Sequence, residues 1–64
     1  MNKRKIMQFI DNNFPPCKSC TIIEEDSDEA VAVLDYGGSD KLQIRVGYFD
    51  ESHNLYRLLQ TDFI

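Results

Sequence analysis

Several residue types are scarce or absent in this chain of 64 residues, and each shortage excludes a class of protein. There is no tryptophan, one histidine, two prolines, three glycines and two cysteines. Two cysteines allow at most one disulfide, so the chain is not a disulfide-rich secreted scaffold. Gly37 and Gly38 stand as an isolated pair, so no glycine-rich phosphate loop is present. No apolar run approaches the ~18 residues of a membrane span.

The residues that are present are typical of one small globular domain. The composition is 42% hydrophobic and 28% charged, with three tyrosines and four phenylalanines. We therefore expect a single domain over residues 1–64, with a core so small that a partner often adds stability. The basic start, residues 1–5, precedes an apolar stretch too short for a signal peptide, so we expect a cytoplasmic protein.

The net charge of −4 is unevenly distributed along the chain. Residues 1–18 carry four basic residues and one acidic residue, whereas residues 19–64 carry three basic and ten acidic residues. An acidic body argues against direct binding to DNA or RNA. It favours either a basic protein surface as the partner or a simple contribution to solubility.

Hydrophobic periodicity predicts an α+β fold. Apolar residues at helical spacing indicate an amphipathic helix over residues 3–14, with Asn2 as its N-cap and two prolines after its end. Alternating or continuous apolar runs predict strands over residues 21–25, 30–36, 41–49 and 55–63, with turns at 37–40 and 50–54. We expect the helix to pack on one face of an antiparallel meander of three to four strands.

The last predicted strand has apolar residues on both faces. Regular alternation puts Leu55, Leu59 and Phe63 on one face, and Tyr56 and Leu58, with Ile64, on the other. One short helix cannot cover both sets. They are therefore either ordinary exposed hydrophobic residues or a face or edge used for dimerisation or partner docking.

Cys17 and Cys20 form a C-x-x-C motif that has several interpretations. The motif follows the predicted helix instead of beginning one, so the thiol activation of thioredoxin-like enzymes is not expected. Structural zinc needs four ligands, and the chain offers these thiols and His53, unless two chains share a metal. The other interpretations are a reversible disulfide and two small apolar residues in a linker. We expect no cofactor and no metal.

Two other patterns resemble catalytic or metal sites without meeting their requirements. The acidic run at residues 24–29 lacks the glycine and the closing glutamate of an EF-hand loop. His53 lies in a predicted turn, and a neighbour in sequence such as Ser52 is not thereby positioned as a nucleophile. A pair of catalytic carboxylates needs a concave pocket, which so short a chain rarely encloses. We therefore expect a binding protein, not an enzyme.

The acidic residues are the strongest candidates for a binding surface. Carboxylates on alternate residues of a strand, ~6.6 Å apart, can imitate a row of DNA phosphates. Such a surface could be extended by Asp35, Asp40, Asp50, Glu51 and Asp62. The residues that we expect to contact a basic partner are Glu24, Glu25, Asp26, Asp28, Glu29, Asp50 and Glu51, with Tyr56 and Leu58 as apolar anchors.

The C-terminal part of the chain resembles a known family. The stretch Tyr48-Phe49-Asp50-Glu51-Ser52, followed by Leu58-Leu59-Gln60-Thr61-Asp62, is similar to a strand–turn–strand stretch of the phage uracil-DNA glycosylase inhibitors, over about a third of the chain. The longer helical first half of that family is missing here. The order of a short helix and an acidic meander is also similar to some small anti-CRISPR proteins. Both resemblances imply a phage or mobile-element protein that occupies the basic DNA-binding surface of a host enzyme.

Three functional hypotheses follow. The first is an acidic inhibitor that blocks a host nucleic-acid-handling enzyme. The second is a structural or regulatory module that forms a homodimer through its last strand. The third is a redox or zinc switch at Cys17 and Cys20.

Overall fold

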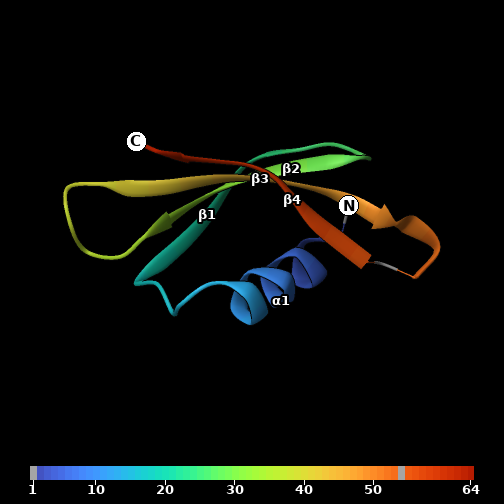
Figure 1. Cartoon of the computed structure of the whole chain (residues 1–64), viewed down its shortest axis with the longest axis horizontal. Helices are drawn as coiled ribbons and strands as arrows, with labels where there is room; N and C mark the ends of the chain where they lie inside the picture. The colour runs from blue at the N-terminus through green and yellow to red at the C-terminus, as the bar shows by residue number, and fades with distance from the viewer. Residues whose placement is uncertain (1, 54) are drawn as a thin grey trace.

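The computed structural model describes residues 2–53 and 55–64, in which one helix lies against a four-stranded sheet (Figure 1). The helix α1 spans Lys3–Asn13, and the strands are β1 (Ser19–Glu25), β2 (Glu29–Asp35), β3 (Lys41–Asp50) and β4 (Leu55–Phe63). A short 3-10 turn, η1 (Glu51–His53), follows β3. Met1 of the predicted basic start and Asn54 of the predicted turn at 50–54 lie outside the described residues.

The sheet is an antiparallel meander with the spatial order β1-β2-β3-β4. The predicted α+β fold, with the helix preceding the meander, is therefore confirmed. β2 and β3 are the central strands, as the near-continuous apolar run of β2 indicated. β1 and β4 are the two edges. No helix within the described ranges is long and apolar enough to cross a membrane.

The helix α1 begins at a side-chain cap and ends before the two prolines. Asn2 Oδ1 accepts hydrogen bonds from the backbone N–H groups of Arg4, at 3.0 Å, and Lys5, at 3.3 Å. Such a bond satisfies N–H groups that have no partner within the helix. Phe14 is extended, because the residue before a proline disfavours the helical conformation. The helix therefore ends at Asn13, one residue before the predicted end.

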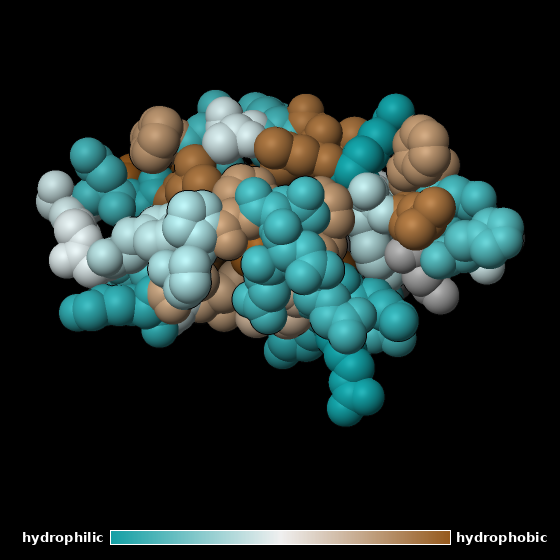
Figure 2. All heavy atoms as spheres, turned by 60° about the horizontal axis from the view of Figure 1, so that its bottom comes forward, coloured by the Kyte–Doolittle hydropathy of each residue, from teal (hydrophilic) through white to brown (hydrophobic). Residues whose placement is uncertain are grey.

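The core lies between α1 and one face of the sheet. Ile6 and Ile10 of the helix are buried there, and burial of such a side chain contributes about 1.5–3 kcal/mol. The buried sheet residues beneath them are Ala30, Ala32, Leu34, Ile44 and Val46. Viewed from the helix side, hydrophilic side chains cover the centre of the molecule and apolar side chains appear around them (Figure 2).

Three β-bulges change the pairing of the strands, and the sequence pattern predicted none of them. The register shifts leave Ile23 as an extra residue of β1, Phe49 of β3 and Leu59 of β4. Each of these side chains is exposed. A bulge places two residues of one strand opposite a single residue of the other, so it changes the face on which later residues lie.

The bulge at Leu59 makes the predicted division of the last strand wrong. Tyr56 packs against the core beneath α1, and Phe63 pairs with the core-packed Leu42 on this same face. Leu59 lies on the opposite face, where its side chain covers Gly47. The predicted partners Leu59 and Phe63 are therefore separated, because the extra residue breaks the regular alternation.

Candidate functional site

The meander brings the acidic segments of the sequence to one end of the sheet. The β1–β2 turn and the β3–β4 turn lie at the same end, since successive turns of a meander alternate between ends. A shallow groove joins the two turns and is lined by Asp28 and Glu51, among others. We call the seven predicted carboxylates gathered here the acidic end: Glu24, Glu25, Asp26, Asp28, Glu29, Asp50 and Glu51.

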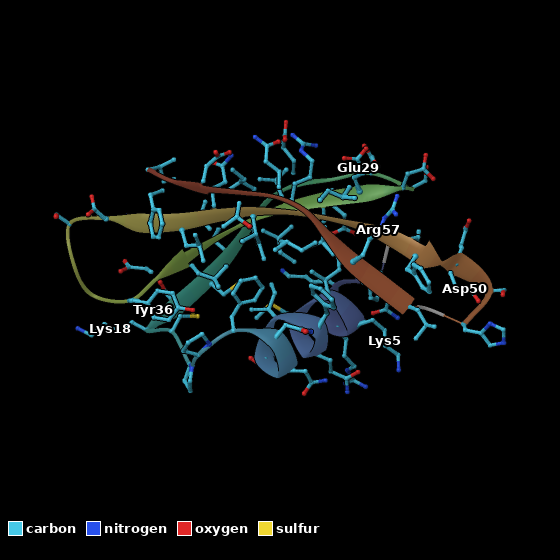
Figure 3. The ribbon with its side chains drawn as sticks, viewed as in Figure 1. Lys5, Lys18, Glu29, Tyr36, Asp50 and Arg57 are labelled. Atoms are coloured by element: carbon cyan, nitrogen blue, oxygen red, sulfur yellow. The ribbon has the colours of Figure 1, made fainter. Side chains whose placement is uncertain are left out.

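The other acidic residues of the sheet lie elsewhere. Asp35 and Asp40 flank the β2–β3 turn, and Asp62 is near the end of β4, so all three are at the opposite end. Figure 3 shows this division, with Glu29 and Asp50 at the acidic end and Tyr36 at the other. The expectation that carboxylates elsewhere extend the surface is therefore wrong for Asp35, Asp40 and Asp62, whereas Asp50 and Glu51 do lie beside the β1–β2 turn. The seven carboxylates cluster around two turns.

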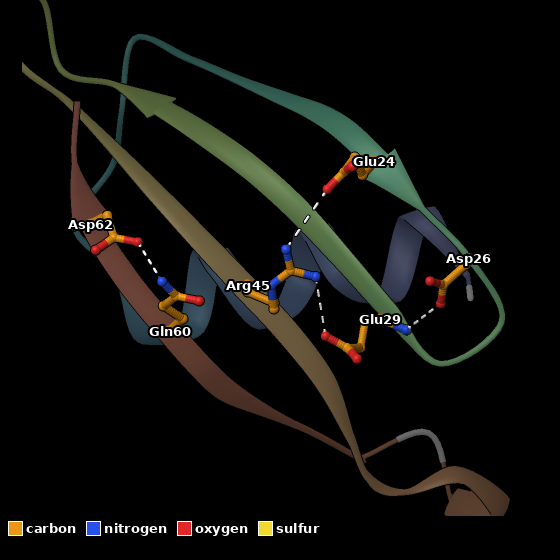
Figure 4. A network of polar contacts seen from close by, with 6 residues as sticks. All are labelled: Glu24, Asp26, Glu29, Arg45, Gln60 and Asp62. Carbon is orange, nitrogen blue, oxygen red and sulfur yellow. Dashed lines mark hydrogen bonds and ion pairs between the residues drawn. The ribbon is translucent and has the colours of Figure 1, made fainter.

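Arg45 of β3 holds two members of the acidic end on the sheet face opposite α1. Its Nη1 lies 3.2 Å from Glu29 Oε1, and its Nη2 lies 3.8 Å from Glu24 Oε2. The contact with Glu24, which is on β1, passes over β2 (Figure 4). Arg45 also lies opposite Val31, which is only 1% exposed although α1 does not cover this face. Sequence analysis missed Arg45, because its partners depend on the strand register.

Asp26 closes the turn between β1 and β2. Its Oδ1 accepts hydrogen bonds from the backbone N–H groups of Asp28 and Glu29, both at 2.8 Å. These two bonds, the one from Asp28 first, lower the pKa of Asp26 below its ordinary value, because they stabilise the ionised carboxylate. The turn therefore keeps a negative charge fixed at its tip.

Asp50 organises the second turn through Ser52 and His53. Its Oδ1 accepts bonds from the Ser52 hydroxyl at 2.8 Å and the Ser52 N–H at 3.1 Å, and its Oδ2 lies 2.8 Å from His53 Nδ1. The Ser52 hydroxyl, and then His53, lower the pKa of Asp50. In a catalytic triad the serine contacts the imidazole nitrogen that the carboxylate does not. Here Ser52 Oγ lies 3.2 Å from the same Nδ1, so the arrangement is a turn and not a triad.

Positive charge borders the acidic end on two sides. Lys5, near the start of α1, lines a groove with His53 and Leu55 on the helix side of the molecule. Arg57 of β4 lines the groove between the two acidic turns. Figure 3 shows Lys5 and Arg57 at the same end as Asp50. The surface with the most negative charge is therefore restricted to the tips of the two turns.

The two predicted apolar anchors differ in exposure. The Tyr56 ring stacks on Tyr48 at a centroid distance of 5.1 Å and meets the edge of Phe9 at 6.3 Å. Tyr56 therefore belongs largely to the core, whereas Leu58 is 42% exposed. The exposed apolar side chains at the acidic end include Phe49, which is 70% exposed, and Leu55, which is 49% exposed and pairs with Asp50. Phe49 was not among the predicted contact residues, although the alternation of β3 already places it on the face opposite Tyr48.

Cys17 and Cys20 are free thiols, half-buried against the core. Burial, and then the neighbouring Cys17 and Asp11, raise the pKa of the Cys20 thiol. A reactive thiol has the opposite shift. Across residues 2–53 and 55–64, no group of three potential metal ligands is present. A zinc site within one copy of the described chain therefore has no third ligand.

The chain was compared with known proteins at three levels. No protein-family model, no curated protein and no solved structure matches it. Its function is therefore argued from the geometry of its own residues.

Proposed function

We propose that this protein binds a basic surface of another protein through the acidic end and thereby blocks access of nucleic acid to that surface. The observation that supports this proposal is the convergence of seven carboxylates in and beside two separate turns at one end of the sheet, where the aromatic side chain of Phe49 is exposed. The sequence resemblances add the expectation that the partner is a host enzyme and that the protein comes from a phage or a mobile element.

The carboxylates of the acidic end divide into two groups. Four of them have structural partners: Glu24 and Glu29 pair with Arg45, and Asp26 and Asp50 hold their turns. The other three, Glu25, Asp28 and Glu51, are exposed and have no side-chain partner within the described part of the chain. These three are available for a second protein.

A basic protein surface fits this group better than other ligands do. The carboxylates repel the phosphates of nucleic acid, and the grooves at this end are shallow and polar. Complementary charge accelerates association and orients the partners. Proteins that bind nucleic acid carry basic patches that hold phosphates, and the charge of such a patch complements this group of carboxylates.

Phe49 supplies the apolar contact that a charge cluster lacks. Aromatic residues that become buried at the centre of an interface contribute a large share of its binding energy, whereas peripheral charges mainly affect the association rate. Phe49 directly precedes Asp50 and Glu51, so a bound partner would cover the ring and neutralise the turn together.

The proposal is tested by capture on the immobilised protein from a lysate of the organism that carries it, at low and high salt. We expect basic nucleic-acid-binding proteins to be retained at low salt and to be displaced by added duplex DNA. The charge-reversal variant Asp28→Lys/Glu51→Lys should lose this retention, because it inverts two of the three available carboxylates.

A matched control changes the net charge by the same amount away from the acidic end. The variant Asp11→Lys/Asp40→Lys alters exposed residues on α1 and beside the β2–β3 turn, and it should retain the same proteins. Equal loss in both variants would mean that only net charge matters. Capture that neither salt, DNA nor charge reversal affects would refute the proposal.

A further inference from the structure

β4 is an edge strand with an exposed apolar side-chain pattern. β3 pairs with one side of it, and no other strand of the described chain pairs with the second side. Edge strands usually carry several charged residues or a proline that prevent further pairing. From Leu55 to Ile64 only Arg57 and Asp62 are charged, and there is no proline. The large exposed hydrophobic residues here are Leu55, Leu58, Leu59, Phe63 and Ile64.

The backbone of β4 offers four residues for pairing at the open edge. Lys41 and Ile64 exchange two backbone hydrogen bonds, at 2.9 and 2.8 Å. In an antiparallel ladder such bonded pairs alternate with pairs that exchange no hydrogen bonds. Along β3 the bonded positions are therefore Lys41, Gln43, Arg45 and Gly47, and the non-bonded positions are Leu42, Ile44, Val46 and Tyr48. The β4 partners of the non-bonded positions therefore direct their N–H and C=O groups outward: Phe63, Thr61, Leu58 and Tyr56.

Two antiparallel copies of β4 can pair all four of these residues in one register. Tyr56 then faces Phe63 of the second copy, and Leu58 faces Thr61 of the second copy. Every other two-fold register pairs at most two of the four. This register follows from the backbone N–H and C=O groups alone. A good fit of its side chains is therefore independent support for it.

The side chains of this register are complementary in charge and polarity. Arg57 faces Asp62 of the second copy, and Leu55 faces Ile64 of the second copy. The symmetry repeats each pair, so two ion pairs, two aromatic pairs and two aliphatic pairs form along one interface. Opposite charges and aromatic pairs across strands are among the pairs that stabilise sheets.

In this register the paired residues also lie on the same face of the sheet, because of the bulge at Leu59. Paired residues must lie on the same face of a continuous sheet. Leu58 and Thr61 are three residues apart and would lie on opposite faces of a regular strand. Because Leu59 is an extra residue, both lie on the side of α1, where their β3 partners Val46 and Ile44 are buried.

We infer that β4 pairs with β4 of a second copy of this chain in this register, forming a two-fold dimer with one continuous sheet. Both helices then lie on the same side of that sheet. The two acidic ends lie at its opposite ends and remain accessible. The dimer does not depend on the proposed function, and it would give the protein two copies of its binding surface.

The test of the dimer is a charge swap measured by analytical ultracentrifugation over a range of concentrations. Arg57→Asp and Asp62→Arg each place like charges opposite each other twice, and we expect each to raise the dimer dissociation constant by about tenfold. The double variant Arg57→Asp/Asp62→Arg restores both ion pairs and should return to the wild-type value. The controls Lys18→Asp and Asp11→Arg make the same charge changes at exposed residues outside β4 and should not alter dimerisation.

The register is tested by disulfide cross-linking in a Cys17→Ser/Cys20→Ser background. Arg57→Cys/Asp62→Cys places cysteines at a non-hydrogen-bonded pair, where the Cα atoms are about 4.5 Å apart and a disulfide can form. We expect covalent dimers from this variant and none from the single variants Arg57→Cys and Asp62→Cys, whose cysteines lie far from their symmetry mates in this register. Far-ultraviolet circular dichroism of each variant checks that the fold is kept.

Three results would overturn the inference. They are a wild-type protein that stays monomeric at high concentration, a double charge swap that fails to restore dimerisation, and equal cross-linking of the double-cysteine variant and the single-cysteine variants. Capture of a basic partner is measured separately, because the charge-swapped protein keeps the three available carboxylates of the acidic end. Failure of the dimer can therefore be distinguished from failure of the proposed function.

Discussion

Arg45 offers a direct test of how the uncovered face of the sheet is stabilised. The side chain makes two ion pairs and also covers Val31, and two substitutions separate these contributions. Arg45→Met removes the charge and keeps most of the aliphatic stem over Val31. Arg45→Ala removes both the charge and the cover. The difference between the two variants therefore isolates the packing contribution.

The expected magnitudes follow from the exposure of these groups. The side chains of Arg45, Glu29 and Glu24 are 40%, 41% and 69% exposed, so each ion pair contributes about 0.2–1 kcal/mol. Loss of cover over part of Val31 costs about 1 kcal/mol more. We expect Arg45→Met to lower the free energy of unfolding by about 1 kcal/mol and Arg45→Ala by about 2 kcal/mol. These losses are a large share of the roughly 3–10 kcal/mol of unfolding free energy expected for so short a chain.

The assay is urea unfolding followed by circular dichroism, at low salt and in concentrated sodium chloride. Salt should reduce the difference in unfolding free energy between wild type and Arg45→Met, because it screens partly exposed charges. It should leave the difference between the two variants unchanged. Equal losses in Arg45→Met and Arg45→Ala would refute the idea that the stem of Arg45 shields Val31.

Three further predictions concern the turns and the helix start. The folded pKa values of Asp26 and Asp50 are lowered, so the stability that these carboxylates contribute is present above the ordinary carboxyl pKa and is lost as the pH falls through the folded values. Urea midpoints measured from about pH 5 to about pH 2 should therefore decline, and Asp26→Asn should make the decline shallower; an unchanged slope would contradict this. Tyr36→Phe removes the 2.9 Å hydrogen bond from the Tyr36 hydroxyl to the Pro15 carbonyl and should cost about 0.5–1.5 kcal/mol, seen as a lower melting temperature. Asn2→Ala removes the helix cap and should cost about 1 kcal/mol in the same assay, whereas Asn2→Ser should restore most of the loss.

The elements of this fold could be predicted because each is encoded by a local pattern. The helix is specified by the spacing of Ile6 and Ile10 and by the prolines after Phe14, and β3 by strict alternation. The gathering of the acidic end also follows from the order of the elements, since a meander places alternate turns together. These features need no knowledge of which residue pairs with which.

The features that could not be predicted all depend on the register between strands. Nothing in the local sequence marks Phe49 or Leu59 as the extra residue of a bulge, because both are ordinary strand-forming residues. The outward face of Leu59 was therefore missed. The same holds for Arg45, whose partners Glu24 and Glu29 come from two other strands.

The meander also has a consequence for the time order of folding. Every strand pairs with its neighbour in sequence, so the sheet can form from local hairpins, and such topologies fold quickly. The helix has a different requirement. It is synthesised first, but its 11 residues are too few for a stable isolated helix. Ile6 and Ile10 reach their partners Ile44 and Val46 only after β3 has emerged from the ribosome. The N-terminal segment is therefore expected to stay unstructured during synthesis until β3 is available to pack against it.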